Sequence, residues 1–438
     1  MVEVQRRWIR VFAVGVLAAF MATQAAAQVR GEITGPGASR LPVAVPDLTQ
    51  GAGANPAAAA AFVKALRADL DHSGLFRVIN PMAYIHDAAT SGITNASISF
   101  DNWRTIGALG LSVGSIEGGA AGLAVDARYF DVANRSMVGG RRFAGTAADG
   151  SRMGHRMADA IIEFVTGMPG PFESRIAFIS DRGGRFREVY AYTFDGEVRQ
   201  ITNHRSITMS PGWHPTSRSV LFTSFKEHRP MLFSAELGSN ADSRIASKMG
   251  VNVGASYSPD GRKILLAREE AGNTDLYELD PGSASTRRLT SHWGIDVGGS
   301  WSPDGRRIAF CSARSGTPQI YVMSASGEAD ARRLTFEGDY NCSPSWSPDG
   351  KSIAFAGRRQ GAFHIFVVPV TGGSARQLTF AGSNEDPTWS PDSRYIAFTG
   401  RRGAQKKIYM TDILGRWERQ LTDGPGNDSS PSWSRRLN

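Results

Sequence analysis

The sequence predicts two domains: an N-terminal α/β (α+β) domain, then an all-β six-bladed β-propeller closed by the C-terminal strand. The first observation is a repeat, an aromatic residue followed by Ser-Pro-Asp-Gly, clearest at Tyr257, Trp301 and Trp346. With the related copies at Trp213, Trp389 and Trp433, the aromatic residue recurs every 43 to 45 residues. A period of about 40–45 residues is typical of a β-propeller blade. The residues before position 172 do not follow the repeat, which indicates a separate domain.

Each repeat has the composition of four short strands joined by turns. Pro-Asp-Gly forms a tight turn, because Pro fixes φ, Asp bonds to the backbone and Gly accepts a positive φ. An apolar strand follows, as in residues 307–310, and then an alternating strand, as in residues 319–323. A short outer strand ends at a Leu-Thr pair such as Leu334-Thr335.

The second strand of the repeat gives the number of blades. It occurs at residues 175–178, 219–222, 263–266, 307–310, 352–355 and 395–398. The first copy lacks an aromatic strand before it, and the last aromatic copy, at Trp433, has no strand after it. We therefore expect six blades over residues 172–438, with Trp433 beside Ile176, because closure removes an exposed sheet edge.

The N-terminus has the composition of a secretory signal peptide over residues 1–27. Three arginines precede an apolar stretch at residues 11–22, which is shorter than the roughly 20 residues of a membrane span. Small residues end the stretch and predict cleavage between Ala27 and Gln28. We therefore expect the mature protein in the periplasm.

Residues 41–168 read as the α/β domain. Strands are expected at residues 41–45, 76–79, 109–116, 121–130 and 137–144, with helices after Asn55-Pro56, at residues 100–107 and around residues 153–164. Residues 28–40 contain several glycines and little apolar content, so we expect a mobile N-terminal segment there.

Charge and cysteine content exclude some classes of function. The net charge of +8 is scattered and forms no Lys/Arg run, so no nucleic-acid partner is expected. The cysteines Cys311 and Cys342 form neither a disulfide framework nor a metal cluster. Whether they pair or remain buried thiols is left open.

No catalytic residue or metal ligand is predicted. Gly110-Leu111-Ser112-Val113-Gly114 matches the nucleophile elbow of hydrolases, but that motif needs a strand, a sharp turn and a helix. Here Ser112 lies inside an alternating strand that a second strand follows. A secreted propeller hydrolase or peptidase and a carbohydrate-binding propeller remain the alternatives to a protein-binding propeller.

The residues that lead each inner strand are the candidate binding site, because they ring the mouth of the channel. They are Met209, Ser210, Val251, Asn252, Asp296, Val297, Asn341, Cys342, Glu385, Asp386, Asn427 and Asp428. Their carboxylates and amides could hold a cation such as Ca²⁺, receive a basic loop, or bond only to channel water. No other cofactor is expected.

Taken together, these features resemble the TolB family of the Tol–Pal system. The resemblance is carried by the signal peptide, the segments Arg30–Thr34 and Leu41–Asp47, and the Trp-Ser-Pro-Asp-Gly blades. It covers essentially the whole mature chain. It implies a monomeric, periplasmic binding protein rather than an enzyme.

The resemblance also implies partners. The peptidoglycan-associated lipoprotein would bind the channel mouth, where Val251 and Val297 replace residues that are polar in other members. The inner-membrane protein TolA would bind the N-terminal segment through Gln28, Val29, Arg30, Glu32, Ile33 and Thr34. Such a protein supports outer-membrane integrity and constriction of the outer membrane during cell division.

Overall fold

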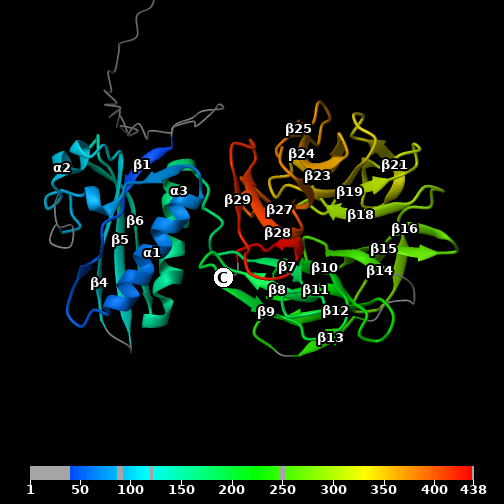
Figure 1. The fold of residues 1–438 in the computed structure, drawn as a ribbon, viewed down its shortest axis with the longest axis horizontal. Helices are drawn as coiled ribbons and strands as arrows, with labels where there is room; N and C mark the ends of the chain where they lie inside the picture. The colour runs from blue at the N-terminus through cyan, green and yellow to red at the C-terminus, as the bar shows by residue number, and fades with distance from the viewer. Residues whose placement is uncertain are drawn as a thin grey trace, which may run out of the picture.

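The computed structural model describes residues 40–85, 92–118, 122–216, 218–239, 241–245 and 252–436. Two units lie next to each other, the N-terminal domain in blue to cyan and the propeller in green to red (Figure 1). Several predictions lie outside the described residues. They concern the signal peptide, its cleavage at Ala27–Gln28, the TolA-binding residues and Val251.

The N-terminal domain is a mixed sheet with helices on both faces. The strands are β1 (Leu41–Ala44), β2 (Thr49–Gln50), β3 (Phe76–Val78), β4 (Gly110–Glu117), β5 (Leu123–Asp131) and β6 (Ser136–Gly145). The helices are α1 (Pro56–His72), α2 (Phe100–Thr105) and α3 (Gly150–Thr166), with 3₁₀ turns at Pro81–Ala83 and Ala147–Asp149. The order is β3-β1-β4-β5-β6, with β2 beside β4.

Local chemistry explains the helices and their positions. The Asn55 side chain accepts a hydrogen bond from the Ala58 N–H, which caps α1 in front of Pro56. The apolar faces of α1 and α3, including Phe62 and Met157, bury one face of the sheet. Helix α2 covers the other face with Phe100 and Trp103. The predicted order of strands and helices is therefore observed.

Among the described residues, six four-stranded sheets form the propeller. Blade 1 consists of β30 (Asp428–Trp433), β7 (Ile176–Ser180), β8 (Glu188–Tyr192) and β9 (Val198–Gln200); blade 2 of β10 (Thr208–Trp213), β11 (Ser219–Ser224), β12 (Met231–Glu236) and β13 (Asp242–Arg244). Blade 3 consists of β14 (Asn252–Tyr257), β15 (Ile264–Glu270), β16 (Asn273–Leu279) and β17 (Thr286–Arg288); blade 4 of β18 (Asp296–Trp301), β19 (Arg307–Ser312), β20 (Gln319–Ser324) and β21 (Gly327–Arg333). Blade 5 consists of β22 (Asn341–Trp346), β23 (Ser352–Arg359), β24 (Ala362–Pro369) and β25 (Arg376–Gln377); blade 6 of β26 (Ser383–Trp389), β27 (Tyr395–Arg402), β28 (Gln405–Asp412) and β29 (Glu418–Gln420).

The C-terminal strand closes the ring as the sequence predicts. β30 pairs antiparallel with β7, and Trp433 lies opposite Ile176. The Trp433 indole N–H donates to Ser174 Oγ at 2.6 Å, and the Arg175 N–H donates to Ser434 Oγ at 2.9 Å. The last strand is thus joined to the first blade by backbone and side-chain bonds.

The repeated Ser-Pro-Asp-Gly turn satisfies its own polar groups. In blade 4, Ser302 Oγ donates to Asp304 Oδ1 at 2.5 Å, and that oxygen also accepts from the Arg306 N–H. Gly305 has φ of 70°, a left-handed conformation that favours glycine. The turn therefore needs no tertiary partner, which explains why the same residues recur in several blades.

The two domains share a continuous apolar core and polar contacts. Phe62 of α1, Phe172 of the linker and Tyr395 of blade 6 belong to the same buried cluster. The Tyr395 hydroxyl donates to the Ser73 carbonyl oxygen at 2.7 Å. Gly74 has φ of 66°, and Trp417 packs so close that a Cβ there would clash with the indole.

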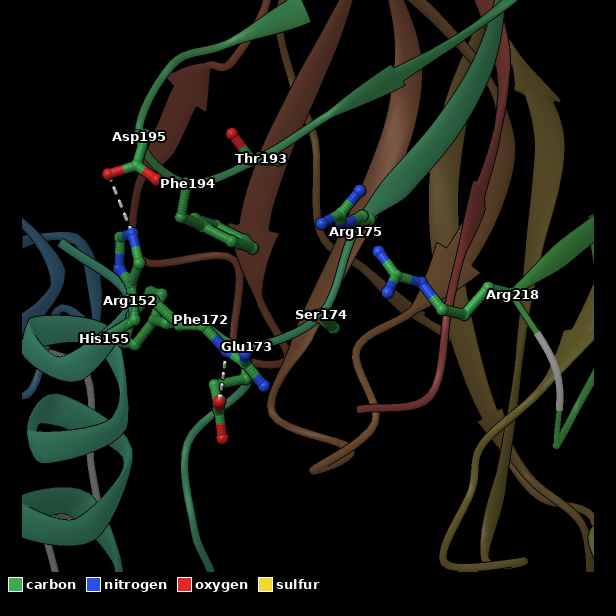
Figure 2. Close-up of a pocket in the computed structure, with 10 residues that line it drawn as sticks. All are labelled: Arg152, His155, Phe172, Glu173, Ser174, Arg175, Thr193, Phe194, Asp195 and Arg218. Carbon is green, nitrogen blue, oxygen red and sulfur yellow. Dashed lines mark ion pairs between the residues drawn. The ribbon is translucent and has the colours of Figure 1, made fainter. Parts of the chain in front are cut away.

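A buried histidine joins the domains electrostatically. His155 of α3 lies 2.5 Å from Asp69 Oδ2 of α1. It also lies 2.9 Å from Asp195 Oδ1, which belongs to the β8–β9 turn of blade 1 (Figure 2). Ser151 of α3 also donates to Asp195. Burial alone would lower the pKa of His155, but its bonds to Asp195 and Asp69 raise that pKa to about 10. The imidazole is therefore charged at neutral pH and bridges two carboxylates.

Cys311 and Cys342 form a disulfide, which settles the pairing that the sequence left open. The bond joins β19 of blade 4 to β22 of blade 5, with the Cα atoms 5.0 Å apart. It therefore crosslinks two neighbouring blades close to the start of an inner strand.

The Cys311→Ser/Cys342→Ser variant should have a lower free energy of unfolding by about 3–4 kcal/mol, because the bond closes a loop with a sequence separation of 31. Urea unfolding followed by tryptophan fluorescence measures this change. Dithiothreitol should destabilise the wild type and leave the variant unchanged. Equal sensitivity of both proteins to the reductant would contradict the pairing.

His155→Gln should remove a pH-dependent part of the stability. Because the folded-state pKa of His155 lies above its ordinary value of 6.5, its contribution is full below about pH 6.5 and disappears as the pH rises through about 10. The groups facing the imidazole are Asp69 and Asp195, with Asp159 and Lys64 nearby. Between pH 6.5 and 10, melting temperatures of the wild type should fall more steeply than those of the variant; parallel curves would refute the bridge.

Candidate functional site

The mouth of the channel lies at the end of the propeller that faces away from the linker. The inner strands start there, and the loops that lead into them and the turns between second and third strands lie at the same end. The Ser-Pro-Asp-Gly turns and the linker to α3 lie at the opposite end, where Trp433 meets Ile176. We call the first end the mouth.

A backbone bulge interrupts each inner strand, and we call these six bulges together the waist. The third residue of each strand, or the fourth in β26, has a positive φ of 52° to 64°. These residues are Ser210, Gly254, Gly298, Ser343, Asp386 and Ser430, and the pairing register shifts beside each of them. Neighbouring bulges touch, since Asp386 Oδ2 accepts from Ser430 Oγ at 3.3 Å. Burial, then the charge of Glu385, raises the pKa of Asp386.

Asp428 is held inside the protein rather than presented at the mouth. Its side chain is fully buried and accepts from Ser180 Oγ at 2.6 Å, from Arg182 at 2.8 Å and from Lys407 at 3.3 Å. The Lys407 ammonium also donates to the Gly424 carbonyl. Asp428 therefore ties the last mouth loop to blade 1.

Asp296 and Asn341 also lie inside their blades. Both are fully buried. Asp296 accepts from Arg314 at 3.0 Å, and burial raises its pKa. The Asn341 amide donates to Gln319 Oε1 and to the Glu337 carbonyl, both at 2.8 Å. In this structure these residues shape the mouth loops and offer no surface to a partner.

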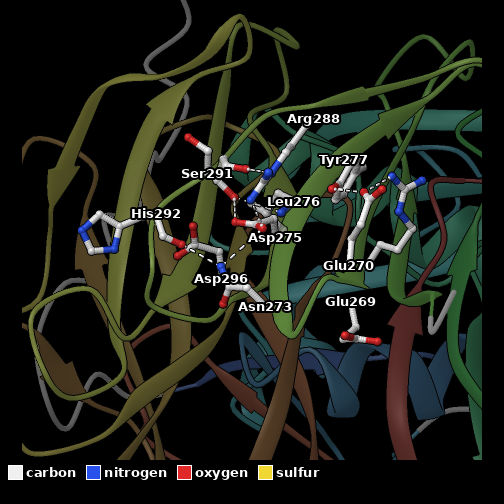
Figure 3. A network of polar contacts seen from close by, with 12 residues as sticks. Glu269, Glu270, Asn273, Asp275, Leu276, Tyr277, Arg288, Ser291, His292 and Asp296 are labelled. Atoms are coloured by element: carbon white, nitrogen blue, oxygen red, sulfur yellow. Dashed lines mark hydrogen bonds and ion pairs between the residues drawn. The ribbon is translucent and has the colours of Figure 1, made fainter.

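The loop before blade 4 shows how buried groups hold the mouth (Figure 3). Asp275 at the start of β16 accepts from Arg288 at 2.5 Å. Asn273 donates to the His292 carbonyl oxygen at 2.7 Å. The loop from Arg288 to Asp296 is thereby fixed at both its ends and at His292.

The other candidate residues occupy mixed positions. Glu385 is ion-paired with Lys406 at 3.1 Å, and the exposed Asn427 donates to Asp181. Met209, Ser210 and Val297 are half-buried, as is Cys342, which is held in the disulfide. Asn252 begins β14, and its side chain lies outside what the structure describes.

The mouth also carries an exposed apolar rim that sequence reasoning missed. The rim consists of Ile207, Trp293, Ile295, Phe336 and Phe380, whose exposed fractions are 46%, 73%, 54%, 73% and 70%. Each residue lies in a loop that leads into an inner strand. The sequence did contain a signal for this rim: large apolar residues follow soon after a Leu-Thr pair, where a polar turn is expected.

Basic residues surround the hollows of the mouth. One cavity of about 290 Å³ between blades 1 and 6 is lined by Arg187, Arg401 and Lys406. A second, of about 440 Å³, lies against blade 2 and is lined by Arg185 and Arg205 among others. Asp181 is the one carboxylate in the lining of the first hollow, and the lining of the second contains none, so cations outnumber carboxylates in both.

One hydrogen-bonded chain resembles a hydrolase triad but is closed to substrate. Ser224 Oγ lies 2.7 Å from His204 Nδ1, and His204 Nε2 lies 2.7 Å from Asp242. Ser224 is fully buried, so its hydroxyl is out of reach of a substrate in this structure. Ser112, the other candidate nucleophile, is buried in the middle of β4, which leads into β5.

Within the described ranges, no group of three or more His, Cys, Asp and Glu side chains is arranged to hold a metal ion. A channel cation stays a prediction. In the same part of the chain, no helix combines the length and apolar character needed to cross a membrane.

Comparisons with known proteins match both domains. A family model for the TolB amino-terminal domain matches residues 29–138, and one for the TolB beta propeller domain matches residues 162–437. A Tol-Pal system protein TolB of Syntrophotalea carbinolica is 40% identical over 45% of this chain and 46% of that protein. One of Desulfosudis oleivorans is 37% identical over 50% of this chain and 51% of that protein. The chain spans about half the length of these curated relatives.

A solved structure extends the likeness to the arrangement of both domains. The crystal structure of TolB from Acinetobacter baumannii superposes with a TM-score of 0.80 at 25% identity, covering 91% of this chain and 97% of that one. The fold expected from the sequence is thereby confirmed. Because the propeller model alone covers more than half of the chain, this protein belongs to the TolB family.

Proposed function

We propose that this chain is the periplasmic protein-binding component of a Tol–Pal trans-envelope system. It binds the peptidoglycan-associated lipoprotein at the mouth of the propeller and TolA through its N-terminal segment. In this role it supports outer-membrane integrity and constriction at cell division. The matched relatives are named Tol-Pal system protein TolB, which supports membership of the system.

The apolar rim carries the proposal for the mouth. Trp293, Phe336 and Phe380 expose about 70% of their surface. Moving such apolar surface out of water is favourable, so these rings are expected to be covered by a partner. Exposed apolar patches rimmed by polar residues are typical of protein interaction sites. Tryptophan and arginine are also enriched among the residues that dominate binding energy. The rim therefore fits a protein partner better than a small substrate.

The charge of the mouth adds a requirement on that partner. Arg187 and Arg401 line one hollow, and Arg205 lines another, close to the rim residue Ile207. An acidic surface on the lipoprotein would be attracted to this face and oriented by it. The complex should therefore form more slowly at high salt.

A carbohydrate-binding function is less well supported. The opposite end of the channel is a cavity of about 840 Å³ lined by repeated prolines and aromatic residues. The rings of Trp213, Trp346, Trp389 and Trp433 are only 6–8% exposed, because they pack between blades. These four rings offer little face on which a sugar could stack, whereas Tyr257 and Trp301 of the same lining are half-buried.

Phe336→Ala/Phe380→Ala should weaken binding of the soluble lipoprotein domain at least tenfold, about 1.4 kcal/mol, because two exposed rings lose contact area. Isothermal titration calorimetry on the mature protein measures the dissociation constant.

Arg187→Gln should mainly slow association and reduce its salt dependence.

Leu109→Ala/Met137→Ala is the matched control, since these side chains are 50% and 52% exposed but belong to the N-terminal domain. The control should bind as the wild type does. If control and rim variants bind alike, the mouth is not the lipoprotein site.

A mature protein that lacks residues 28–34 should lose TolA binding and keep lipoprotein binding, because the proposal assigns the two partners to separate parts of the chain. Pull-down with each purified partner tests this. Retained TolA binding by the shortened protein would refute the assignment of that segment.

A further inference from the structure

A cavity between the domains is built differently from the mouth. It has a volume of about 390 Å³ and lies between α3 and blades 1 and 2 (Figure 2). Helix α3 contributes Arg152 and His155, and the linker contributes residues 172–175. The β8–β9 turn contributes residues 193–195, and the turn before β11 contributes Arg218.

The carboxylates that line this cavity are already engaged. Glu173 lies 3.7 Å from Arg152 and 3.6 Å from Arg156. Asp195 is bound by the charged His155 at 2.9 Å and by Ser151. Neither carboxylate is therefore available to neutralise a further cation of the lining.

Two arginines of the lining are left with like charges next to each other. Arg175 and Arg218 make no ion pair within the described part of the chain, and Figure 2 shows their guanidinium groups turned toward one another. Arg175 is half-buried; burial first, and then repulsion by Arg218, lower its pKa, and the charge of Glu197 only partly offsets them. The Thr193 hydroxyl of the same lining is buried and has no hydrogen-bond partner among the described residues.

We propose that this cavity is an oxyanion site, in which Arg175 and Arg218 bind one carboxylate or phosphate group between them. A guanidinium presents parallel N–H donors that match both groups in a bidentate manner. An anion between the two arginines replaces their mutual repulsion with two attractions. Because Arg175 is half-buried, its attraction to the anion is stronger than it would be in open solvent, whereas Arg218 is exposed.

The position of the cavity gives such an anion a structural consequence. Arg152 belongs to the N-terminal domain, whereas Arg175 and Arg218 belong to the propeller side. An anion held by Arg175 and Arg218 would therefore lie on the propeller side of the interface, next to Arg152 and the His155 bridge. The site is separate from the mouth and does not depend on lipoprotein binding.

The test uses mature protein and two probes, inorganic phosphate and succinate, titrated by calorimetry at constant ionic strength against chloride. The wild type should bind the probe, and the Arg175→Gln/Arg218→Gln variant should bind it at least tenfold more weakly. The control Arg262→Gln changes an exposed arginine at a Ser-Pro-Asp-Gly turn and should bind as the wild type does. Circular dichroism checks that each variant is folded.

The two probes identify the source of the oxyanion. Tighter phosphate binding points to a phosphorylated ligand, and tighter succinate binding points to a carboxylate ligand such as an acidic peptide; either result supports the site if the double variant abolishes it. Equal binding of both probes that is lost in the double variant also supports it. No saturable binding by the wild type, or equal binding by wild type and double variant, overturns the proposal.

Discussion

The pairing of β30 with β7 is the constraint on which the rest of the propeller depends. It joins residues about 250 positions apart, with Asp428 opposite Ser180 and Trp433 opposite Ile176. Without it, blade 1 would expose the edge of β7, and blade 6 would have no neighbour on one side. The same strand also places Trp433 in the apolar cluster shared with the N-terminal domain. One strand therefore fixes the mouth, the waist and the domain interface together.

Some residues of the mouth are buried and hold its loops in place, and others are exposed to solvent. Buried groups such as Asp275, Asp296 and Asp428 hold the loops through charged hydrogen bonds. Residues such as Trp293 and Phe336 extend from the same loops into solvent. A loop held at both ends loses little conformational freedom when a partner binds, so more of the contact energy remains as affinity. The polar network and the apolar rim are thus two parts of one binding surface.

Blade number, strand order and ring closure could be predicted because they depend on local signals repeated many times. The turn at Ser302 to Gly305 satisfies its own polar groups, and the second strand of each blade is a short apolar run that recurs with the turn. That the side chains of Asp296 and Asn341 point into their blades could not be predicted, because the bulge after each residue changes which way neighbouring side chains point. The bond between Cys311 and Cys342 and the His155 bridge depend on contacts between distant segments, which one sequence does not reveal.

The bulges at the waist have an effect on how this protein can evolve. Ser210, Ser343, Asp386 and Ser430 occupy a left-handed conformation that costs a residue with a Cβ roughly 1 kcal/mol or more. A β-branched or bulky replacement would add steric strain there. Sequence drift at these positions is therefore confined to glycine and small polar side chains. The backbone therefore limits which side chains can occupy the bulges, whatever substitutions accumulate on the loops around them.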